Sequence, residues 1–394
     1  MKTALTDTDL TDDETLLAET VRAYFGDFVD NSYLNRQRDS DQGYDRGRWK
    51  QLCDLGWTGV NLPERVGGGG GTLAEAGIVA RECGRAAFAS PLLQSARAAT
   101  ALLGLGLGLG ADHDGRFDAV LTRIASGSPV ALVAPPDRTL SAVPAESAVP
   151  AESAVPADDG NGYRVCGSPV IVEWLDQSED VVLLLPVPQS GRWLCAVVTR
   201  GQLDGRSTAV PSVDNERMAR LDLEGFELTP DTAQLAEVAP AAAANALARA
   251  DLLRASSMVG GCEAVLERTV SYALERVQFG QPIGAFQAVR HHAARIAIAV
   301  DAARMTCNDA LTRADVGEEV TAIGAVALFA AGRSYVTAVL TAAQVHGGVG
   351  TTTEHVLHHH FRRAKAGQLR AGKRASRLRE IHQALVVRHE GSLW

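Results

Sequence analysis

An arginine between two long helical patterns has the surroundings that point most clearly to chemistry. It is Arg276, which opens the segment Arg-Val-Gln-Phe-Gly-Gln-Pro-Ile-Gly-Ala-Phe-Gln that ends at Gln287. A second segment, Gln-Val-His-Gly-Gly-Val-Gly, runs from Gln344 to Gly350. Arginine offers a planar, always charged pair of donors, and glycines let backbone N–H groups approach a phosphate. These groups would suit a phosphate ligand, although Arg276 alone is better explained as a helix-end charge favoured by the helix dipole.

Histidines are a second group that could do chemistry. His355 and His359 are four residues apart, a spacing that places both side chains on one helix face and can hold a metal ion. No third ligand of fitting spacing is evident. We therefore expect these histidines to be solvated or at an interface, and we expect no metal site.

Length, charge and cysteine usage limit the class of protein. A chain of 394 residues exceeds one hydrophobic core and predicts two or three domains. The net charge of −9 argues against a nucleic-acid or anionic-membrane partner. The six cysteines are far apart with no CxxC pair, which predicts a reduced chain. The polar, acidic N-terminus is no signal peptide and no apolar run reaches membrane-spanning length, so we expect a cytoplasmic protein.

Residue patterns divide the chain into three parts and predict the α+β class. Helical spacing, introduced by a capping box at Thr11 and interrupted by a mobile loop at 67–71, predicts an all-α domain over residues 1–125. Short β-rich runs predict an antiparallel β domain over 126–235. Within it, three copies of Ser-Ala-Val-Pro-Ala-Glu, the last ending in Asp, predict a flexible loop at 141–158. Four long helical patterns predict an up-and-down four-helix bundle over 236–394.

This order of parts, with these motifs, resembles the acyl-CoA dehydrogenase family over essentially the whole chain. The segment from Trp57 to Gly70 is similar to a family motif of the N-terminal domain, and the segment ending at Gln287 is the most specific match. The resemblance implies bound FAD. Arg276 would reach across a subunit interface to the pyrophosphate of a neighbour's FAD, and Gln278 and Phe279 would contact its adenosine half.

The resemblance assigns further residues to the same cofactor pocket. Gln344 and the backbone at Gly347 and Gly348 would complete it, and Gln287 belongs to the same set. The segments that hold the flavin ring in the family correspond to 133–136 and 170–172, where the usual polar side chains are missing. Trp174 lies nearby, either as a core residue of the β domain or as a shifted stacking partner for the ring.

The base that the family reaction needs is not where the family keeps it. A carboxylate must take the α-proton of an acyl thioester while the β-hydrogen leaves as hydride to the flavin. The position of the catalytic glutamate in one branch of the family is Ala371 here, and in a second branch it is Ala250. Asp251 is adjacent to the latter position, about 100° around a helix. It is either a displaced base or an ordinary exposed aspartate.

Three functions are compatible with this pattern. The first is an FAD-dependent acyl-CoA or acyl-carrier thioester dehydrogenase that carries out α,β-dehydrogenation, with Asp251 as the base. The second is a catalytically degenerate partner subunit of a heteromeric acyl-CoA dehydrogenase. The third is flavin monooxygenation or non-redox tailoring on the same fold. The resemblance also implies a homotetramer or an α2β2 heterotetramer, and an electron-acceptor flavoprotein as a further partner.

Overall fold

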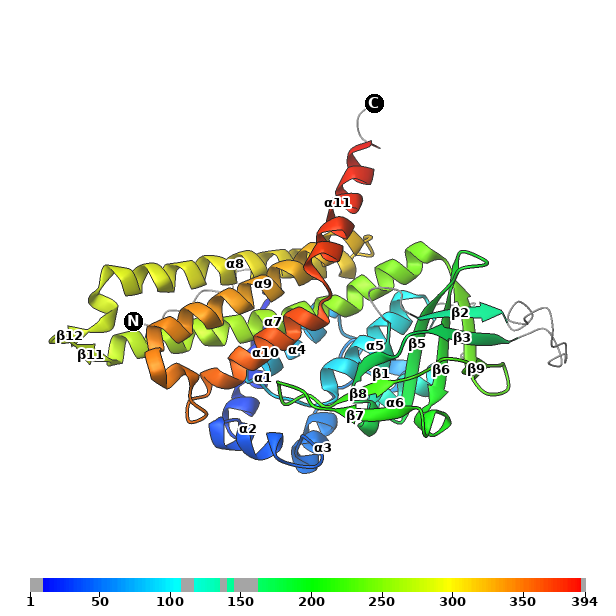
Figure 1. Cartoon of the computed structure of the whole chain (residues 1–394), viewed down its shortest axis with the longest axis horizontal. Helices are drawn as coiled ribbons and strands as arrows, with labels where there is room; N and C mark the ends of the chain where they lie inside the picture. The colour runs from blue at the N-terminus through cyan, green and yellow to red at the C-terminus, as the bar shows by residue number, and fades with distance from the viewer. Residues whose placement is uncertain (1–9, 108–116, 135–139, 145–161, 391–394) are drawn as a thin grey trace.

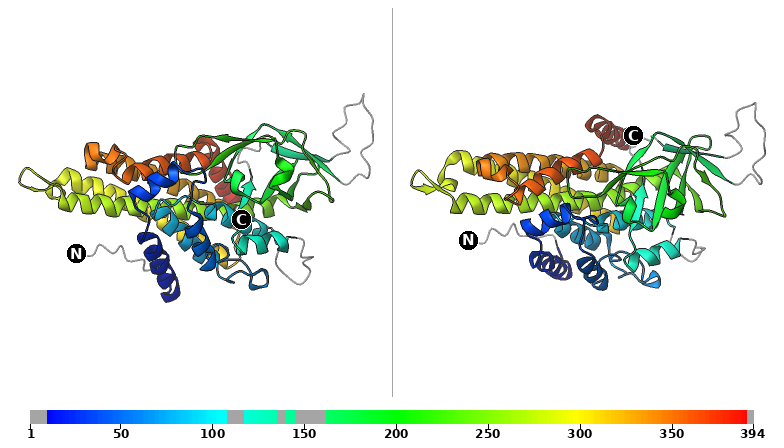
Figure 2. Two further views of the ribbon diagram at one scale, coloured as in Figure 1. Left: turned by 90° about the horizontal axis from the view of Figure 1, so that it is seen from below. Right: turned by 60° about the horizontal axis from the view of Figure 1, so that its bottom comes forward.

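The computed structural model describes residues 10–107, 117–134, 140–144 and 162–390 (Figure 1). Helices come first, strands follow at one end of the molecule, and long helices complete the chain. Figure 2 shows that α1 to α3 lie along one side of the C-terminal helices. The N-terminal helices are α1 (Asp12–Gly26), α2 (Asn31–Arg38), α3 (Arg46–Asp54), α4 (Leu73–Arg85), α5 (Leu92–Gly104) and α6 (Asp118–Ala125).

Side-chain caps set where several of these helices begin. Thr11 and Thr72 each form a capping box with a glutamate three residues later, which confirms the prediction at Thr11. A mobile loop was predicted at the glycine segment 67–71, but the structure shows a segment held by backbone hydrogen bonds. Its amides are tied to the preceding turn, with Gly69 N–H donating to the Gly59 carbonyl at 2.9 Å and Gly71 N–H to the Val60 carbonyl at 2.8 Å.

Ten strands of the described residues form three sheets next to the helices. The largest sheet has the order β1-β5-β6-β10, and the others have the orders β2-β3-β9 and β4-β8-β7. The bounds are β1 (Val130–Val133), β2 (Leu140–Pro144), β3 (Tyr163–Gly167), β4 (Val170–Glu173), β5 (Asp180–Val187), β6 (Arg192–Thr199), β7 (Ser207–Val210), β8 (Met218–Leu221), β9 (Glu227–Leu228) and β10 (Gln234–Val238).

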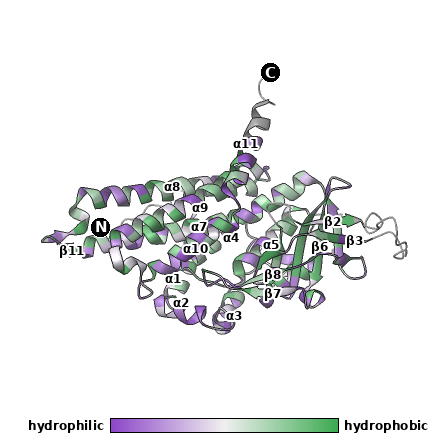
Figure 3. Ribbon diagram, in the orientation of Figure 1, coloured by the Kyte–Doolittle hydropathy of each residue, from purple (hydrophilic) through white to green (hydrophobic). Residues whose placement is uncertain are grey.

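The β domain differs from the predicted one in two respects. Strands β1 and β5 pair in parallel, with Val130 opposite Asp180, so the domain is not purely antiparallel. The predicted loop at 141–158 begins as strand β2, and its remainder lies outside the described residues. Strand β5 is buried on both faces, since Leu183 and its alternates face the β-domain core while Leu184 faces α5 and α6. This double burial explains its unbroken apolar sequence, which is visible in Figure 3.

The C-terminal part is a helical bundle, as predicted, but its last segment is divided. Three long helices are followed by two shorter ones: α7 (Pro240–Glu275), α8 (Gln287–Asp315), α9 (Thr321–His346), α10 (Leu357–Arg370) and α11 (Arg374–Glu390). The expected fourth helix is interrupted at Gly372, whose φ of +97° ends helical geometry. Helix α11 consequently projects away from the bundle (Figure 1).

Helix α9 is apolar enough to cross a membrane by length and composition, contrary to the expectation from the sequence. The segment Thr321–Thr351 reaches a mean hydropathy of 1.6 over its best window, and half of that window is buried in the protein. The helix packs against α7, α8 and α10. Its apolar residues therefore form the core of the bundle.

Helices α4 and α7 cross in backbone contact. A Cβ placed on Gly84 would lie 1.8 Å from the Ser257 carbonyl oxygen, and one placed on Gly260 would lie 1.8 Å from the Arg81 carbonyl oxygen. Real side chains do not tolerate such distances, so both positions need glycine. The crossing fixes the separation of the N-terminal helices from the bundle.

Candidate functional site

The predicted diphosphate segment is an exposed hairpin at one end of the bundle. Helix α7 ends next to Arg276, and the hairpin β11 (Val277–Gln278) and β12 (Gln281–Pro282) leads into α8 through the turn η5 (Ile283–Ala285). Phe279 is 92% exposed and has a φ of +53°. Arg276, Gln278 and Gln287 are also exposed. No residue that the structure describes makes a hydrogen bond or ion pair with the Arg276 guanidinium.

The second predicted segment lies against the end of α7. Helix α9 ends at His346, and the 3-10 turn η6 (Gly347–Thr351) follows. The Tyr272 ring stacks on the His346 ring with centroids 4.4 Å apart and an interplanar angle of 19°. The Tyr272 hydroxyl also donates to the His346 carbonyl at 3.5 Å. These contacts bring two segments that are distant in the sequence to the same end of the bundle.

This end of the bundle fits the phosphate half of a dinucleotide. It presents a free guanidinium, an exposed aromatic ring and two exposed glycines, Gly347 and Gly348. A Cβ on either glycine would meet no atom within 4 Å, so a ligand can approach their backbone from the outside. Gln344 is exposed one turn before them. Because the described residues leave this surface open, another subunit is needed to enclose a cofactor here.

A second region of interest is a cavity lined by residues of this chain alone and separate from the hairpin end; we call it the chain's own cleft. It has a volume of about 650 Å³ and lies between the sheets and helices α5, α7 and α10. Its lining includes apolar side chains from the strands, namely Leu132, Val133, Val170, Ile171 and Met218. Three arginines, one from each helix, line the same cavity: Arg97, Arg254 and Arg370.

A carboxylate from the end of strand β4 holds two of these arginines. The Arg254 guanidinium donates to both carboxylate oxygens of Glu173. Arg370 lies 3.3 Å from the same carboxylate and makes two hydrogen bonds, of 2.6 and 2.7 Å, to Asp214. Burial would raise the pKa of the Glu173 carboxyl, but Arg254 and Arg370 outweigh it and hold that pKa well below its usual range. Glu173 is therefore an ionised structural partner.

The candidate base Asp251 is held by arginines in the same way. Its Oδ1 accepts a hydrogen bond of 2.6 Å from Arg97, and Arg377 lies 3.5 Å from its Oδ2. Burial acts to raise the pKa of Asp251, yet Arg97, with Arg377 and Arg254, lowers it below the ordinary value. A general base in this reaction needs a raised pKa, so this environment is unsuited to a base.

The two family base positions are filled by small apolar side chains. Ala250 is fully buried and Ala371 is 6% exposed. At the flavin-ring segments, Val133, Ala134 and Ile171 line the cavity and offer no side-chain donor. Pro135 and Pro136 lie outside the described residues. Trp174 is 1% exposed, contacts Tyr44 edge-on and donates to Glu216, so it is a core residue rather than a stacking partner for a ring.

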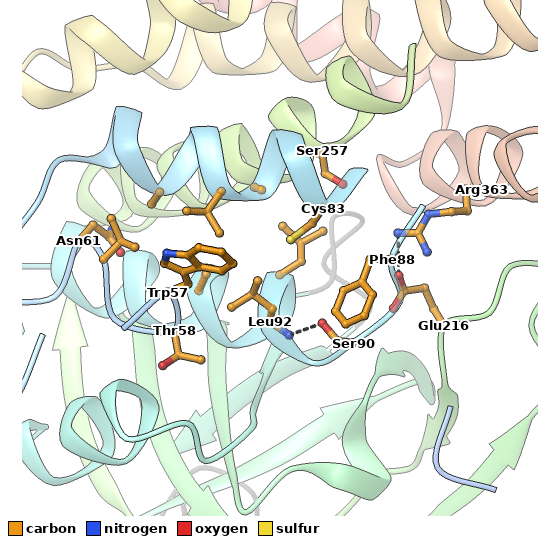
Figure 4. Close-up of a pocket in the computed structure, with 16 residues that line it drawn as sticks. Trp57, Thr58, Asn61, Cys83, Phe88, Ser90, Leu92, Glu216, Ser257 and Arg363 are labelled. Atoms are coloured by element: carbon orange, nitrogen blue, oxygen red, sulfur yellow. Dashed lines mark hydrogen bonds and ion pairs between the residues drawn. The ribbon is translucent and has the colours of Figure 1, made fainter. Parts of the chain in front are cut away.

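A second, narrow pocket lies between α4, α5 and α7 (Figure 4). Trp57, Leu92 and Phe88 line it, and the ion pair of Glu216 and Arg363, 2.9 Å apart, stands at one end. Burial raises the pKa of the Glu216 carboxyl against the lowering effect of Arg363. The cavity volume of about 20 Å³ has room for little more than a water molecule, so an acyl chain would need this pocket to widen.

The predicted histidine pair does not converge. His359 contacts His358, with ring centroids 3.8 Å apart, and Asn215, whereas His355 lies beside His346. Within the described ranges, no three potential ligands come together in a geometry that could hold a metal ion. His358, His359 and His360 are buried, and not solvated as expected.

The three arginines of the cavity were not predicted as a site from the sequence. Arg97 is the one charged residue of α5, and Arg254 follows the apolar pair Leu252 and Leu253 on α7; a charged residue at such a position is the signal that could have revealed them. Glu173 had no comparable signal, because an acidic residue at a strand end is common.

Comparisons with known proteins are consistent along the chain. The model of the acyl-CoA dehydrogenase N-terminal domain matches residues 11–107, and that of the C-terminal domain matches residues 241–386. The protein called acyl-CoA dehydrogenase IpdE2 from Mycobacterium tuberculosis is 32% identical over 382 residues, 96% of each chain.

Solved structures agree on the fold. The ChsE4-ChsE5 complex from Mycobacterium tuberculosis matches with a TM-score of 0.80 and 25% identity, covering 96% of this chain and 98% of that one. A variant of the Tcur3481-Tcur3483 steroid enzyme matches with a TM-score of 0.81 and 24% identity, covering 97% and 99%.

Proposed function

Because the chain belongs to the acyl-CoA dehydrogenase family, whose members bind FAD, we propose that it is one subunit of a heteromeric acyl-CoA dehydrogenase. In this role it contributes Arg276, Gln278, Phe279 and Gln344 to an FAD that is held mainly by a homologous subunit. An FAD held there would supply the acceptor for hydride from an acyl-CoA or acyl-carrier thioester. The base comes from the homologous subunit, and the cytoplasm is the expected location.

The contrast between the hairpin end of the bundle and the chain's own cleft carries this proposal. The hairpin end keeps an unpaired guanidinium and open glycines, which suit a diphosphate from another subunit. Both base positions are alanines, the carboxylate that lines the chain's own cleft, Glu173, is ion-paired to Arg254, and Asp251 is ion-paired to Arg97. A complete dehydrogenase would need a catalytic base in its own cleft as well as the diphosphate-binding surface.

The similar solved structures add a separate line of support. The structure of the ChsE4-ChsE5 complex, as its name states, contains two different components. The Tcur3481-Tcur3483 protein also has a two-part name, although its identity to this chain supports the fold alone. A complex of two different components is therefore an arrangement seen for a protein that this chain resembles.

Expression of the chain alone and together with a homologous subunit tests the proposal. We expect a colourless protein from the chain alone and a yellow complex, with fewer FAD molecules than subunits, from co-expression. A yellow protein that acyl-CoA bleaches under anaerobic conditions, obtained from the chain alone, would contradict the proposal and support the complete enzyme. Bound flavin that consumes oxygen with an external reductase would support monooxygenation instead.

A further inference from the structure

We infer that the chain's own cleft is a binding site for a carboxylate attached to an apolar body, such as the free end of an acyl group. This inference does not depend on the partner-subunit proposal, because neither Arg276 nor another residue of the hairpin end lines the cavity.

The cavity lining combines basic and apolar side chains. Arg97, Arg254 and Arg370 line it, and Glu173 is the one carboxylate among the described lining residues. The acids that balance Arg97 and Arg370 are Asp251 and Asp214, which do not line the cavity. The charged side chains that line the cavity are therefore mostly positive. They would attract an anion into the cavity.

Arg97 has donor capacity left over. Its Nη1 donates to Gln94 and its Nη2 to Asp251, but its Nε–H, which is itself buried, has no acceptor in the parts of the chain that the structure describes. The Arg97 side chain is 10% exposed. Burial lowers the pKa of Arg97, and the like charge of Arg254 lowers it further. A ligand carboxylate near Arg97 would offset the free-energy cost of burying this charge and of placing it near Arg254.

The apolar side chains of the lining indicate what kind of molecule carries the carboxylate. Val170 and Ile171 from β4 and Leu132 and Val133 from β1 line the cavity together with the arginines. A small inorganic anion would leave these apolar side chains in contact with water, whereas an aliphatic or ring-bearing carboxylate would cover them. Guanidinium groups also match the planar carboxylate with paired hydrogen bonds.

Titration calorimetry on the full chain, or on its complex if it purifies as one, tests the inference with matched ligands. Octanoate should bind at least about ten times more tightly than octanol, because octanol covers the apolar side chains without an anionic end. Inorganic phosphate should bind more weakly than octanoate. Equal binding of octanoate and octanol, or octanoate release in proportion to added FAD, would overturn the inference.

A second pair of ligands distinguishes the source of the carboxylate. Suberyl-CoA differs from octanoyl-CoA by a carboxylate at the far end of the chain. Tighter binding of suberyl-CoA supports a thioester that carries this group, and octanoate binding without that preference supports a free acid.

Variants place the interaction on Arg97. Arg97→Gln should weaken octanoate binding about ten-fold or more, and Arg97→Lys should weaken it less. Arg164→Gln removes an exposed arginine that pairs with Glu227 outside the cavity, and it should leave the affinity unchanged. If Arg97→Gln does not fold, the octanoate and octanol comparison on the unchanged chain still decides the question. Retained affinity in a folded Arg97→Gln protein would contradict the inference.

Discussion

Arg97 and Asp251 form an ion pair of 2.6 Å between α5 and α7, next to the buried Ala250. Their side chains are 10% and 17% exposed. Desolvated ion pairs of this kind are costly to break, because the remaining partner keeps its charge without compensation. The pair therefore acts as a structural connection between two helices, and the role of Asp251 can be tested by separating stability from turnover.

Replacing Asp251 with Asn should reduce stability and leave chemistry intact. We expect a loss of about 2–4 kcal/mol in the free energy of unfolding, since Arg97 and Arg377 both lose their anionic partner. Urea denaturation measures this loss, and Asp231→Asn, at an exposed position, should change stability by less than about 0.5 kcal/mol. Turnover of the assembled complex per folded molecule should be unchanged. Abolished turnover with full stability would identify Asp251 as the base.

Removing the Arg276 guanidinium should weaken FAD retention. Arg276→Ala is expected to raise the FAD dissociation constant of the assembled enzyme by about 10- to 100-fold, the range for a lost charge-assisted hydrogen-bonded contact. Folding should be unaffected, because the side chain is exposed. Arg295→Ala, at an exposed position of α8, is the matched control. Flavin fluorescence after gel filtration measures retention, and equal occupancy in both variants would show that Arg276 does not serve the cofactor.

Tyr272 should act on the same cofactor indirectly, through the ring of His346. Tyr272→Phe keeps the stacked ring and should retain FAD nearly as well as the unchanged chain. Tyr272→Ala removes the stack and should loosen FAD several-fold, because the glycine turn after His346 loses its support. The far-UV circular dichroism spectrum should not change. Equal FAD affinity of the two variants would contradict this positioning role.

Acidification should destabilise the protein through its buried histidines. Burial lowers the pKa of His359 to about 3, helped by His358 and Arg362, and burial also lowers the pKa of His360 well below its usual value. The unfolded chain binds protons near pH 6.5 while the folded chain does not, so the contribution is complete above that pH and falls as the pH decreases. Together the two histidines should cost about 2 kcal/mol between pH 6.5 and 5.5.

Urea midpoints measured across this pH range check the histidine prediction. His359→Gln should reduce the slope of stability against pH by about half of the histidine contribution. His382→Gln, at an exposed position of α11, should leave the slope as it is. A slope that is unchanged in His359→Gln would show that this histidine is protonated equally in both states.

A methyl group at Gly84 should be strongly destabilising. Its Cβ would lie 1.8 Å from the Ser257 carbonyl oxygen, so Gly84→Ala must push α4 away from α7. We expect a loss of at least about 3 kcal/mol in the free energy of unfolding. Gly201→Ala adds the same methyl group where no atom lies within 4 Å, and should have little effect. Similar urea midpoints for the two variants would mean that the helices can separate at low cost.

The hairpin end could be predicted from the sequence because its residues are contiguous. Arg276 to Gln287 is one segment, its glycine and proline positions specify a turn, and the neighbouring segment is a second short motif. Local sequence also determined the capping box at Thr11. Where backbone geometry depends on adjacent residues, a motif describes the structure directly.

The cleft could not be predicted in this way, because its charged residues come from four separate elements. Arg97, Glu173, Arg254 and Arg370 lie on α5, β4, α7 and α10, and no spacing rule relates them. The parallel pairing of β1 with β5 depends equally on tertiary structure, since it joins strands with three others between them in the sequence. An aspartate that looked exposed in the sequence is buried for the same reason.

The crossing of α4 and α7 also determines where the narrow pocket can be enlarged. One side of the narrow pocket in Figure 4 is formed by α4 and α7, whose main chains are in contact. Smaller side chains on that side would therefore not increase the distance between the two helices. Space for a bulkier guest must come from the opposite side, where Trp57, Leu92 and Leu93 can be exchanged for smaller residues. Enlargement of this pocket should therefore require changes at those three positions, while Gly84 and Gly260 stay as they are.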